Sequence, residues 1–267
     1  MARQKGHVKY VGTIGDVRHF KIKGQEGYFA GMIGGPTGDQ VKTAPEFART
    51  RENMNEFGAC AKAGKSIRTG LSQVMKQMAD SQVTGRLTSI MKKINLEDQT
   101  EARGYRKIEI STQRTYLIGF EFDKNTSMSG VFNAPYTLTH PTTRISGSLV
   151  VPAFNPMNLI NAPAGSTHFR LITSVSVLSD FEYNAVTNAY EPLEPALNEL
   201  SDIKYSTYLS LDITVPLTTV VAALPTGTTL NANVTILQCV GIEFYQKVGV
   251  NYYLFASGNC LKIEDAF

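Results

Sequence analysis

The chain has 267 residues, of which 42% are hydrophobic and 18% are charged, so it is long and apolar enough to bury a core in one or two domains. No apolar run reaches the roughly 18 residues that a membrane-spanning helix needs, and no signal-peptide pattern follows the first charges. The three scattered cysteines, Cys60, Cys239 and Cys260, exclude a disulfide framework. We therefore expect a globular protein that is made in the cytoplasm without a signal peptide.

Charge is divided unevenly along the chain. Residues 1–114 hold 20 Lys and Arg against 11 Asp and Glu, a net charge of +9, whereas residues 115–267 hold 6 against 12, a net charge of −6. A basic half can attract polyanions such as nucleic acid. Opposite halves can also draw copies of one chain together head to tail. Two ordinary solvated surfaces of different composition are the simplest alternative.

Residues 1–42 are rich in glycine and alternate weakly between apolar and polar side chains. They predict short strands around Tyr10, from Val17 to Lys21, and at Tyr28 and Phe29, with turns at Gly15-Asp16 and over residues 24–27. Residues 31–39 are predicted as a loop or an extended arm. Because this zone has little apolar surface of its own, we expect a hairpin or arm that packs on another surface, such as a neighbouring subunit.

Residues 43–104 predict a small helical subdomain. Thr43 and Glu46 form a capping box for a first helix, in which we expect Phe47 and Phe57 to be core residues and Gly58 and Gly64 to weaken the continuation. Apolar residues at helical spacing predict two further helices, one over residues 67–78 and one over residues 87–94 with Lys92 and Lys93 facing water.

Residues 105–267 read as strands rich in Thr, Val, Ile and Tyr. The predicted strands cover Ile108 and Ile110, then residues 116–122, 144–151, 169–178, 205–215, 233–244 and 251–256. Residues 117–122 echo residues 239–244, which allows them to be equivalent strands, although a chance match is the alternative. Short strands without helical periods indicate an antiparallel sandwich, a jelly roll or a similar barrel.

The whole sequence therefore predicts an α+β protein of three zones. These are a glycine-rich N-terminal hairpin or arm over residues 1–42, a helical subdomain over 43–104, and an antiparallel, jelly-roll-like β-sandwich over 105–267.

No motif for catalysis stands out. The four histidines lack metal-binding spacing, and residues 59–66 lack the first glycine of a phosphate-binding loop. The carboxylate pairs Glu121 with Asp123 and Asp180 with Glu182 occupy alternate positions of predicted strands, where a solvated face is more common than a catalytic pair. Cys60 and Cys239 are expected to be buried, and Cys260 to be exposed. We expect no enzyme activity, no cofactor and no metal.

A basic cluster in the helical zone is the best candidate for contacts with a polyanion or with another subunit. Its members are Arg49, Arg51, Lys62, Lys65, Arg68, Lys76, Lys92, Lys93, Arg103, Arg106 and Lys107. Aromatic residues that could stack on bases are sparse in this zone, and no named nucleic-acid motif matches.

Four short motifs occur in order along the chain. They are Gly12-Thr13-Ile14-Gly15; Arg49-Thr50-Arg51-Glu52-Asn53 with Glu56-Phe57-Gly58; Ala63-Gly64-Lys65 with Arg68; and Gly241-Ile242-Glu243-Phe244-Tyr245-Gln246. In this order the chain resembles a family of uncharacterised proteins of Bacteroidota genomes, their phages and their mobile elements. The resemblance covers both ends of the chain but not residues 115–235. It implies no activity and no residue role, and it favours a phage-like or surface-assembly setting.

These observations lead to one main hypothesis, a structural subunit that assembles with copies of itself into a virion, tube or filament. We expect the protein to be located in a virion or in an extracellular assembly. The expected contact residues of the arm and of the interface are Tyr10, Phe20, Tyr28, Phe29, Tyr252 and Tyr253. The alternative is a non-enzymatic protein that binds nucleic acid or another polyanion through the basic cluster. A third class, an enzyme or a sugar-binding sandwich, requires a pocket.

Overall fold

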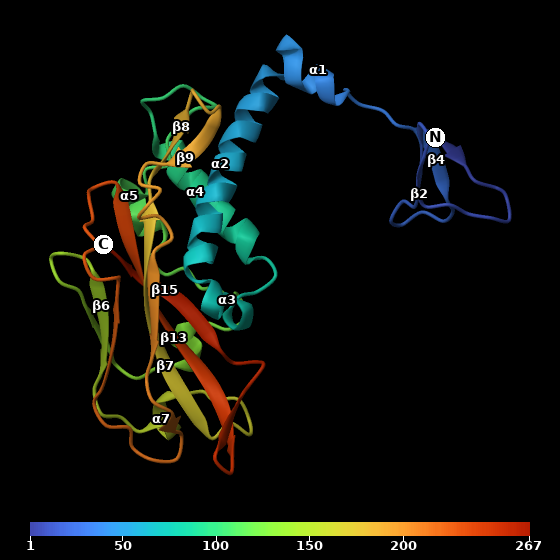
Figure 1. Ribbon diagram of the computed structural model, residues 1–267. Coiled ribbons are helices and arrows are strands. Elements are labelled where there is room, and N and C mark those ends of the chain that lie inside the picture. The colour runs from blue at the N-terminus through green and yellow to red at the C-terminus, as the bar shows by residue number, and fades with distance from the viewer. The chain divides into compact units, whose positions relative to one another are not determined.

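The computed structural model describes all 267 residues and combines helices with several antiparallel sheets, none of which closes (Figure 1). The chain divides into two compact units, residues 1–51 and residues 52–267, and each is described by itself. No helix combines the length and the apolar character needed to cross a membrane.

The first unit is built on a four-stranded sheet of very short strands. Strands β1 (Ala2–Arg3), β2 (Gly12–Ile14), β3 (Val17–Phe20) and β4 (Phe29–Met32) pair in the order β1-β4-β3-β2. Gly15 has a φ of +56° and closes the predicted turn between β2 and β3. Helix α1 (Gly38–Thr43) and the 3-10 turn η1 (Pro45–Phe47) follow.

The predicted capping box of Thr43 and Glu46 is wrong. Thr37 caps α1 instead: its side chain accepts from the Gln40 N–H while the Gln40 side chain accepts from the Thr37 N–H. Thr43 lies in the last turn of α1, and the capping box forms six residues earlier in the chain, at Thr37.

The helices and strands of the second unit follow one another closely. After α2 (Ala48–Gly70), which begins in the first unit, the helical elements are α3 (Ser72–Met78), α4 (Val83–Glu97), α5 (Ile110–Gln113), the 3-10 turn η2 (Arg114–Tyr116), α6 (Met128–Val131) and α7 (Pro156–Leu159). The strands are β5 (Thr137–Thr139), β6 (Ser146–Val151), β7 (His168–Ser179), β8 (Phe181–Asn184), β9 (Ala189–Pro192), β10 (Ser201–Tyr205), β11 (Leu209–Ser210), β12 (Thr218–Ala223), β13 (Val234–Val248), β14 (Asn251–Leu254) and β15 (Cys260–Ala266).

A six-stranded antiparallel sheet forms the centre of this unit. Its order is β10-β7-β13-β14, with β11 also paired to β7 and β15 to β13. The long strands β7 and β13 are buried over most of their length, and most of the side chains on both of their faces are apolar or small.

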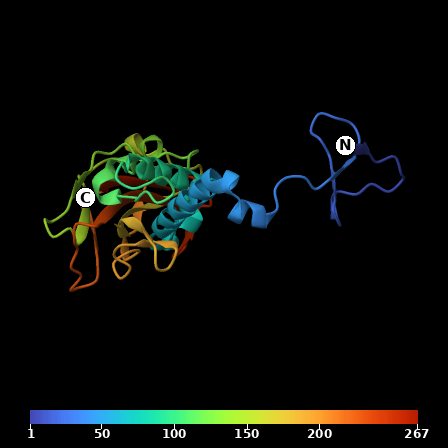
Figure 2. The ribbon, with the colours of Figure 1, turned by 90° about the horizontal axis from the view of Figure 1, so that it is seen from above.

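Helices cover one face of the central sheet, and Figure 2 shows the same helices from above. Ile67 of α2 and Met91 of α4 belong to one core cluster with Ile172 of β7 and Cys239 of β13. The opposite face packs against the three-stranded sheet β12-β6-β5, because Leu149 of β6 shares a second cluster with side chains of β7 and β13. The body therefore has three layers.

Helix α2 differs from the expectation at its glycines and its aromatic residues. It continues through Gly58 and Gly64, and Phe57 is 61% exposed rather than buried. The buried side of α2 consists of small residues such as Ala59 and Ala63. Gly64 lies against α4, where a methyl group would come within 3.4 Å of the Leu87 Cβ. Close approach of two helices, not a row of large side chains, therefore decides which side is buried.

Residues 108–122 do not form the predicted strands. Asp180 accepts from the N–H and the hydroxyl of Ser111, and the segment turns into α5 and η2. Gly119 then adopts a φ of +85°. The echo between residues 117–122 and residues 239–244 is therefore not an equivalence of strands. Residues 205–215 are also strand only at Tyr205 and over β11.

Candidate functional site

The first unit contains no buried residue. One face of its sheet carries Ile14 and Met32, which are 57% and 74% exposed. On the other face the rings of Phe20 and Phe29 stack with centroids 6.2 Å apart, and the Arg18 Cζ lies 5.8 Å from the Phe20 centroid. The sheet therefore presents apolar side chains on both faces.

The other predicted interface residues lie in two places. In the first unit, Tyr10 is exposed with its ring 5.9 Å from that of His19, and the Lys21 Nζ lies 4.8 Å from the Tyr28 centroid. Tyr252 and Tyr253 lie on β14 in the second unit, where Tyr253 is exposed and Tyr252 stacks on the ring of Tyr208.

More than half of the predicted basic cluster is engaged within the chain. The engaged residues are Arg51, Lys62, Lys92, Arg103, Arg106 and Lys107, each bonded to a carboxylate, a carbonyl or both. Of the other five, Arg49, Lys65, Lys76 and Lys93 are exposed, and Arg68 is half-buried with an Nε–H that has no partner. Lys92 does not simply face water as expected, because it pairs with buried Glu56.

Glu56 of α2 organises the region beside the pocket described below. Its carboxylate accepts from the Lys92 ammonium and from the Gly104 N–H at 2.7 Å, and it lies 3.7 Å from the Arg106 Nε. Burial alone would raise the pKa of Glu56, but these hydrogen bonds and positive charges hold the pKa below its ordinary value. A charged Glu56 thus ties α2, α4 and the segment after α4 together.

The segment between α4 and α5 is held by further hydrogen bonds. Asp98 accepts from the N–H and the hydroxyl of Thr100 and from the Lys107 N–H, each at 2.7 Å. Asn95 and Tyr190 both donate to the Arg106 carbonyl, at 2.8 Å and 3.0 Å. These bonds fix the backbone on either side of Tyr105 and Lys107.

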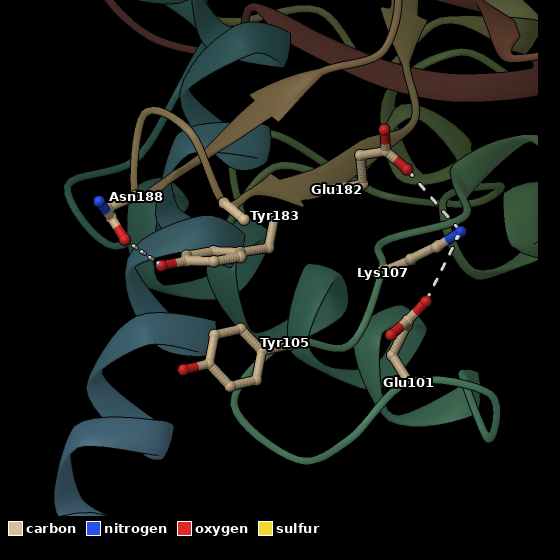
Figure 3. A pocket seen from close by; sticks show the side chains of 7 residues that line it. Glu101, Tyr105, Lys107, Glu182, Tyr183 and Asn188 are labelled. Carbon is tan, nitrogen blue, oxygen red and sulfur yellow. Dashed lines mark hydrogen bonds and ion pairs between the residues drawn. The ribbon is translucent and has the colours of Figure 1, made fainter.

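An open pocket of about 550 Å³ lies between this segment and the hairpin of β8 and β9 (Figure 3). Its lining residues are Glu101, Tyr105, Lys107, Glu182, Tyr183, Ala185 and Asn188. The Lys107 Nζ lies 3.9 Å from Glu101 and 3.7 Å from Glu182, between the two carboxylates. The rings of Tyr105 and Tyr183 meet edge to face with centroids 4.7 Å apart, and the Tyr183 hydroxyl donates to the Asn188 side chain at 3.2 Å.

This pocket offers recognition groups. The two ion pairs of Lys107 are partly exposed, and exposed pairs of this kind contribute about 0–1 kcal/mol each, so the ammonium can exchange a carboxylate for a ligand at little cost. None of the lining side chains forms the contact of a nucleophile with a general base. The arrangement suits a small polar ligand that lies against two tyrosine rings.

The two carboxylate pairs noted in the sequence do not form acid–base pairs. Asp180 is buried and serves as the acceptor for Ser111, whereas Glu182 faces Lys107. Glu121 accepts from the Met128 N–H at 3.1 Å, and burial raises its pKa. Asp123 accepts from the N–H and from the side chain of Asn125, so the four carboxylates have separate structural surroundings.

All three cysteines are buried and unpaired, so the expected exposure of Cys260 is wrong. Burial raises the pKa of each thiol to about 12. Cys260 packs at the start of β15 with its Sγ 3.6 Å from the Met128 Sδ. These thiols are protonated at neutral pH and are packing groups.

Sequence reasoning missed Tyr183 and Asn188 of the pocket. A signal for the hairpin was present, because Phe181-Glu182-Tyr183-Asn184 alternates and is followed closely by Tyr190. In comparisons with known proteins, no family model, no curated protein and no solved structure matches this chain.

Proposed function

We propose that this protein is a structural subunit that assembles with copies of itself, and that residues 1–51 supply the contact. The observation that carries the proposal is that this unit pairs four strands and yet buries no side chain. A small sheet needs an apolar face packed on another surface for stability in water. A neighbouring copy can provide that surface.

Charge supports a second copy as the occupant. Residues 1–51 hold nine Lys and Arg against four Asp and Glu, a net charge of +5. Residues 52–267 hold 17 against 19, a net charge of −2. A basic unit of one copy and an acidic unit of the next attract each other, and a head-to-tail contact of this type can continue into a ring or a filament.

We further propose that the second unit is a β-sandwich of the jelly-roll type. The packing of β6 and β12 against the face of β7 and β13 supports this proposal. The sandwich supplies the rigid body of the subunit, and the strands β5 and β14 stand at sheet edges where another chain could add a strand.

The proposal predicts that removal of residues 1–36 abolishes assembly and leaves the second unit folded. The cut preserves Thr37 and therefore the cap of α1. The core lies wholly within the second unit, since every buried residue has a number of 56 or higher. Light scattering after size-exclusion chromatography measures the mass, negative-stain microscopy the form, and circular dichroism the fold.

A point variant tests whether the apolar face of the sheet in residues 1–51 makes the contact, without removing the unit. Met32→Asp should shift the full chain towards monomers, because a buried carboxylate at the contact is costly. Val186→Asp, at a 90% exposed position in the second unit, is the matched control and should assemble normally. Assembly that survives both the truncation and Met32→Asp would contradict the proposal. Monomers that retain nucleic acid after nuclease treatment would favour the polyanion-binding alternative through Lys65, Lys76 and Lys93.

A further inference from the structure

Beyond the cover of the helices, the central sheet carries a cluster of tyrosines and cations. His168 and Arg170 of β7 lie opposite Tyr245 and Glu243 of β13, and Lys247 lies opposite Tyr252 of β14. Tyr205, at the end of β10, packs against the core cluster that contains the helices. Figure 1 shows β7 and β13 continuing past α3 at this end. We name the set Arg170, Tyr205, Tyr208, Tyr245 and Tyr252 the Arg170 surface.

Arg170 is fixed between aromatic rings. Its Cζ lies 4.0 Å from the Tyr205 centroid and 5.1 Å from the Tyr208 centroid. Tyr208 in turn stacks on Tyr252, with centroids 3.8 Å apart and planes inclined by 5°, and meets Tyr245 edge to face at 5.0 Å. The guanidinium is therefore held in one orientation before any ligand arrives.

The donors of Arg170 are not satisfied within the chain. Its Nε–H is buried without a hydrogen-bond partner, and no carboxylate lies at ion-pair distance from the guanidinium. Glu243, its neighbour across the strands, instead accepts from the Tyr245 hydroxyl at 2.6 Å. A guanidinium is a planar fork of five N–H donors that matches a carboxylate or a phosphate in two-point contact.

The groups around Arg170 favour a carboxylate over a nucleic acid. The facing sides of Tyr208 and Tyr252 are occupied by each other, so they are not open to a base. The positive charges of Arg170 and Lys247 are balanced by Glu243, which lies opposite Arg170 on β13, and by Asp212, whose charge acts on His168, so the local charge is close to neutral. Such a site accommodates one negative charge better than a chain of phosphates.

We propose that the Arg170 surface binds a carboxylate, of the kind presented by an Asp or Glu side chain or by a peptide C-terminus. Arg170 would bind the two oxygens through its terminal Nη–H groups, and the hydroxyl of Tyr208, a 40% exposed residue, would donate to one of them. The proposal concerns only the second unit, and it does not depend on self-assembly.

Saturation-transfer NMR on the full chain tests this proposal with three short probes. They are acetyl-Gly-Glu-Gly-amide, the same peptide with Gln in place of Glu, and the same peptide with phosphoserine. The Glu peptide should bind saturably, and the Gln peptide should bind about tenfold more weakly because it lacks the charge. The phosphoserine peptide should bind no more tightly than the Glu peptide.

Variants assign the binding to this surface. Arg170→Lys keeps the charge but loses the fork, and it should weaken binding of the Glu peptide about tenfold. Tyr208→Phe removes only a hydroxyl at an exposed position, so it tests the site even where Arg170→Lys fails to fold, and it should weaken binding severalfold. Tyr253→Phe, at the adjacent exposed position of β14, is the control and should bind as the wild type does.

Three results would overturn the proposal. The first is equal binding of the Glu and Gln peptides, or no binding of either. The second is an affinity that neither Arg170→Lys nor Tyr208→Phe changes. The third is tighter binding of the phosphoserine peptide, which would identify the surface as a phosphate site.

Discussion

Glu56 shows how a single charge can hold a surface segment in place. It is 1% exposed, yet it stays ionised because Lys92, Arg106 and the Gly104 N–H surround it. The pocket residues Tyr105 and Lys107 lie on the segment that it anchors. Loss of this charge should therefore affect both stability and the shape of the pocket.

Glu56→Gln should lower the free energy of unfolding by about 3 kcal/mol, because it leaves the Lys92 ammonium beside a neutral group. Urea titration followed by circular dichroism measures the change. Glu52→Gln is the control: Glu52 pairs with Arg103 at 3.5 Å in a partly exposed position, and its loss should cost less than about 1 kcal/mol. Equal costs for the two variants would show that Glu56 is not a buried anchor.

The difference in stability between the wild type and Glu56→Gln should depend on pH. The pKa of Glu56 is lower in the folded chain than its ordinary value of 4.5. The stability that Glu56 provides is therefore complete above the unfolded pKa and is lost as the pH falls through the folded pKa. The difference between the wild type and Glu56→Gln should be constant from pH 7 to pH 5 and shrink below pH 4.5. A difference that grows in acid would contradict this assignment.

Two glycines in different elements should respond in opposite ways to the same substitution. Gly241 of β13 faces β15, and an added methyl group would lie 2.8 Å from the Cys260 carbonyl oxygen. Gly241→Ala should therefore destabilise the body by about 2 kcal/mol. Gly58 of α2 has open space around it, so Gly58→Ala should stabilise by up to about 1 kcal/mol. Thermal unfolding measures both variants, and melting temperatures that shift in the same direction would contradict this packing.

The elements that could be predicted from sequence are those whose own residue types indicate a helix or a strand. Helix α4 lies close to its predicted range because its apolar residues recur at helical spacing, and strands β6, β7, β13 and β14 lie close to theirs because Val, Ile, Thr and Tyr favour a sheet. The structure of residues 108–122 could not be predicted, because the hydrogen-bond acceptor for Ser111 at the start of α5 is Asp180, about 70 positions later in the chain. The small-residue side of α2 was also hidden, because its burial depends on the approach of α4.

The same distinction between local and long-range contacts explains which residues of the candidate sites could be predicted from the sequence. The tyrosines and phenylalanines of the first unit could be chosen from composition alone. The pocket could not, because Lys107 and Glu182 meet only through the pairing of Ile108 with Phe181. The site around Arg170 could not be predicted either, because Tyr205 and Tyr208 reach Arg170 only through the pairing of β10 and β11 with β7.

At the scale of the whole molecule, the two units should differ in their resistance to protease. The first unit buries no residue and exposes several Lys and Arg side chains, whereas the second unit buries its long strands. Brief trypsin treatment of unassembled chains should remove residues up to Lys42 or Arg49 and leave a resistant fragment, which mass spectrometry identifies. In assembled material the same bonds should be cut more slowly. Equal cleavage in both forms would argue against residues 1–51 as the contact.

The position of β13 near the end of the chain also sets an order of events during synthesis. β7 meets its main partner only after residues 180–233 have been made, so we expect the central sheet to close late and the body to fold slowly. The first unit leaves the ribosome long before that moment. Under the proposed self-assembly, nascent chains on one messenger would meet through their N-terminal sheets before their bodies are complete, and assembly would begin at the site of translation.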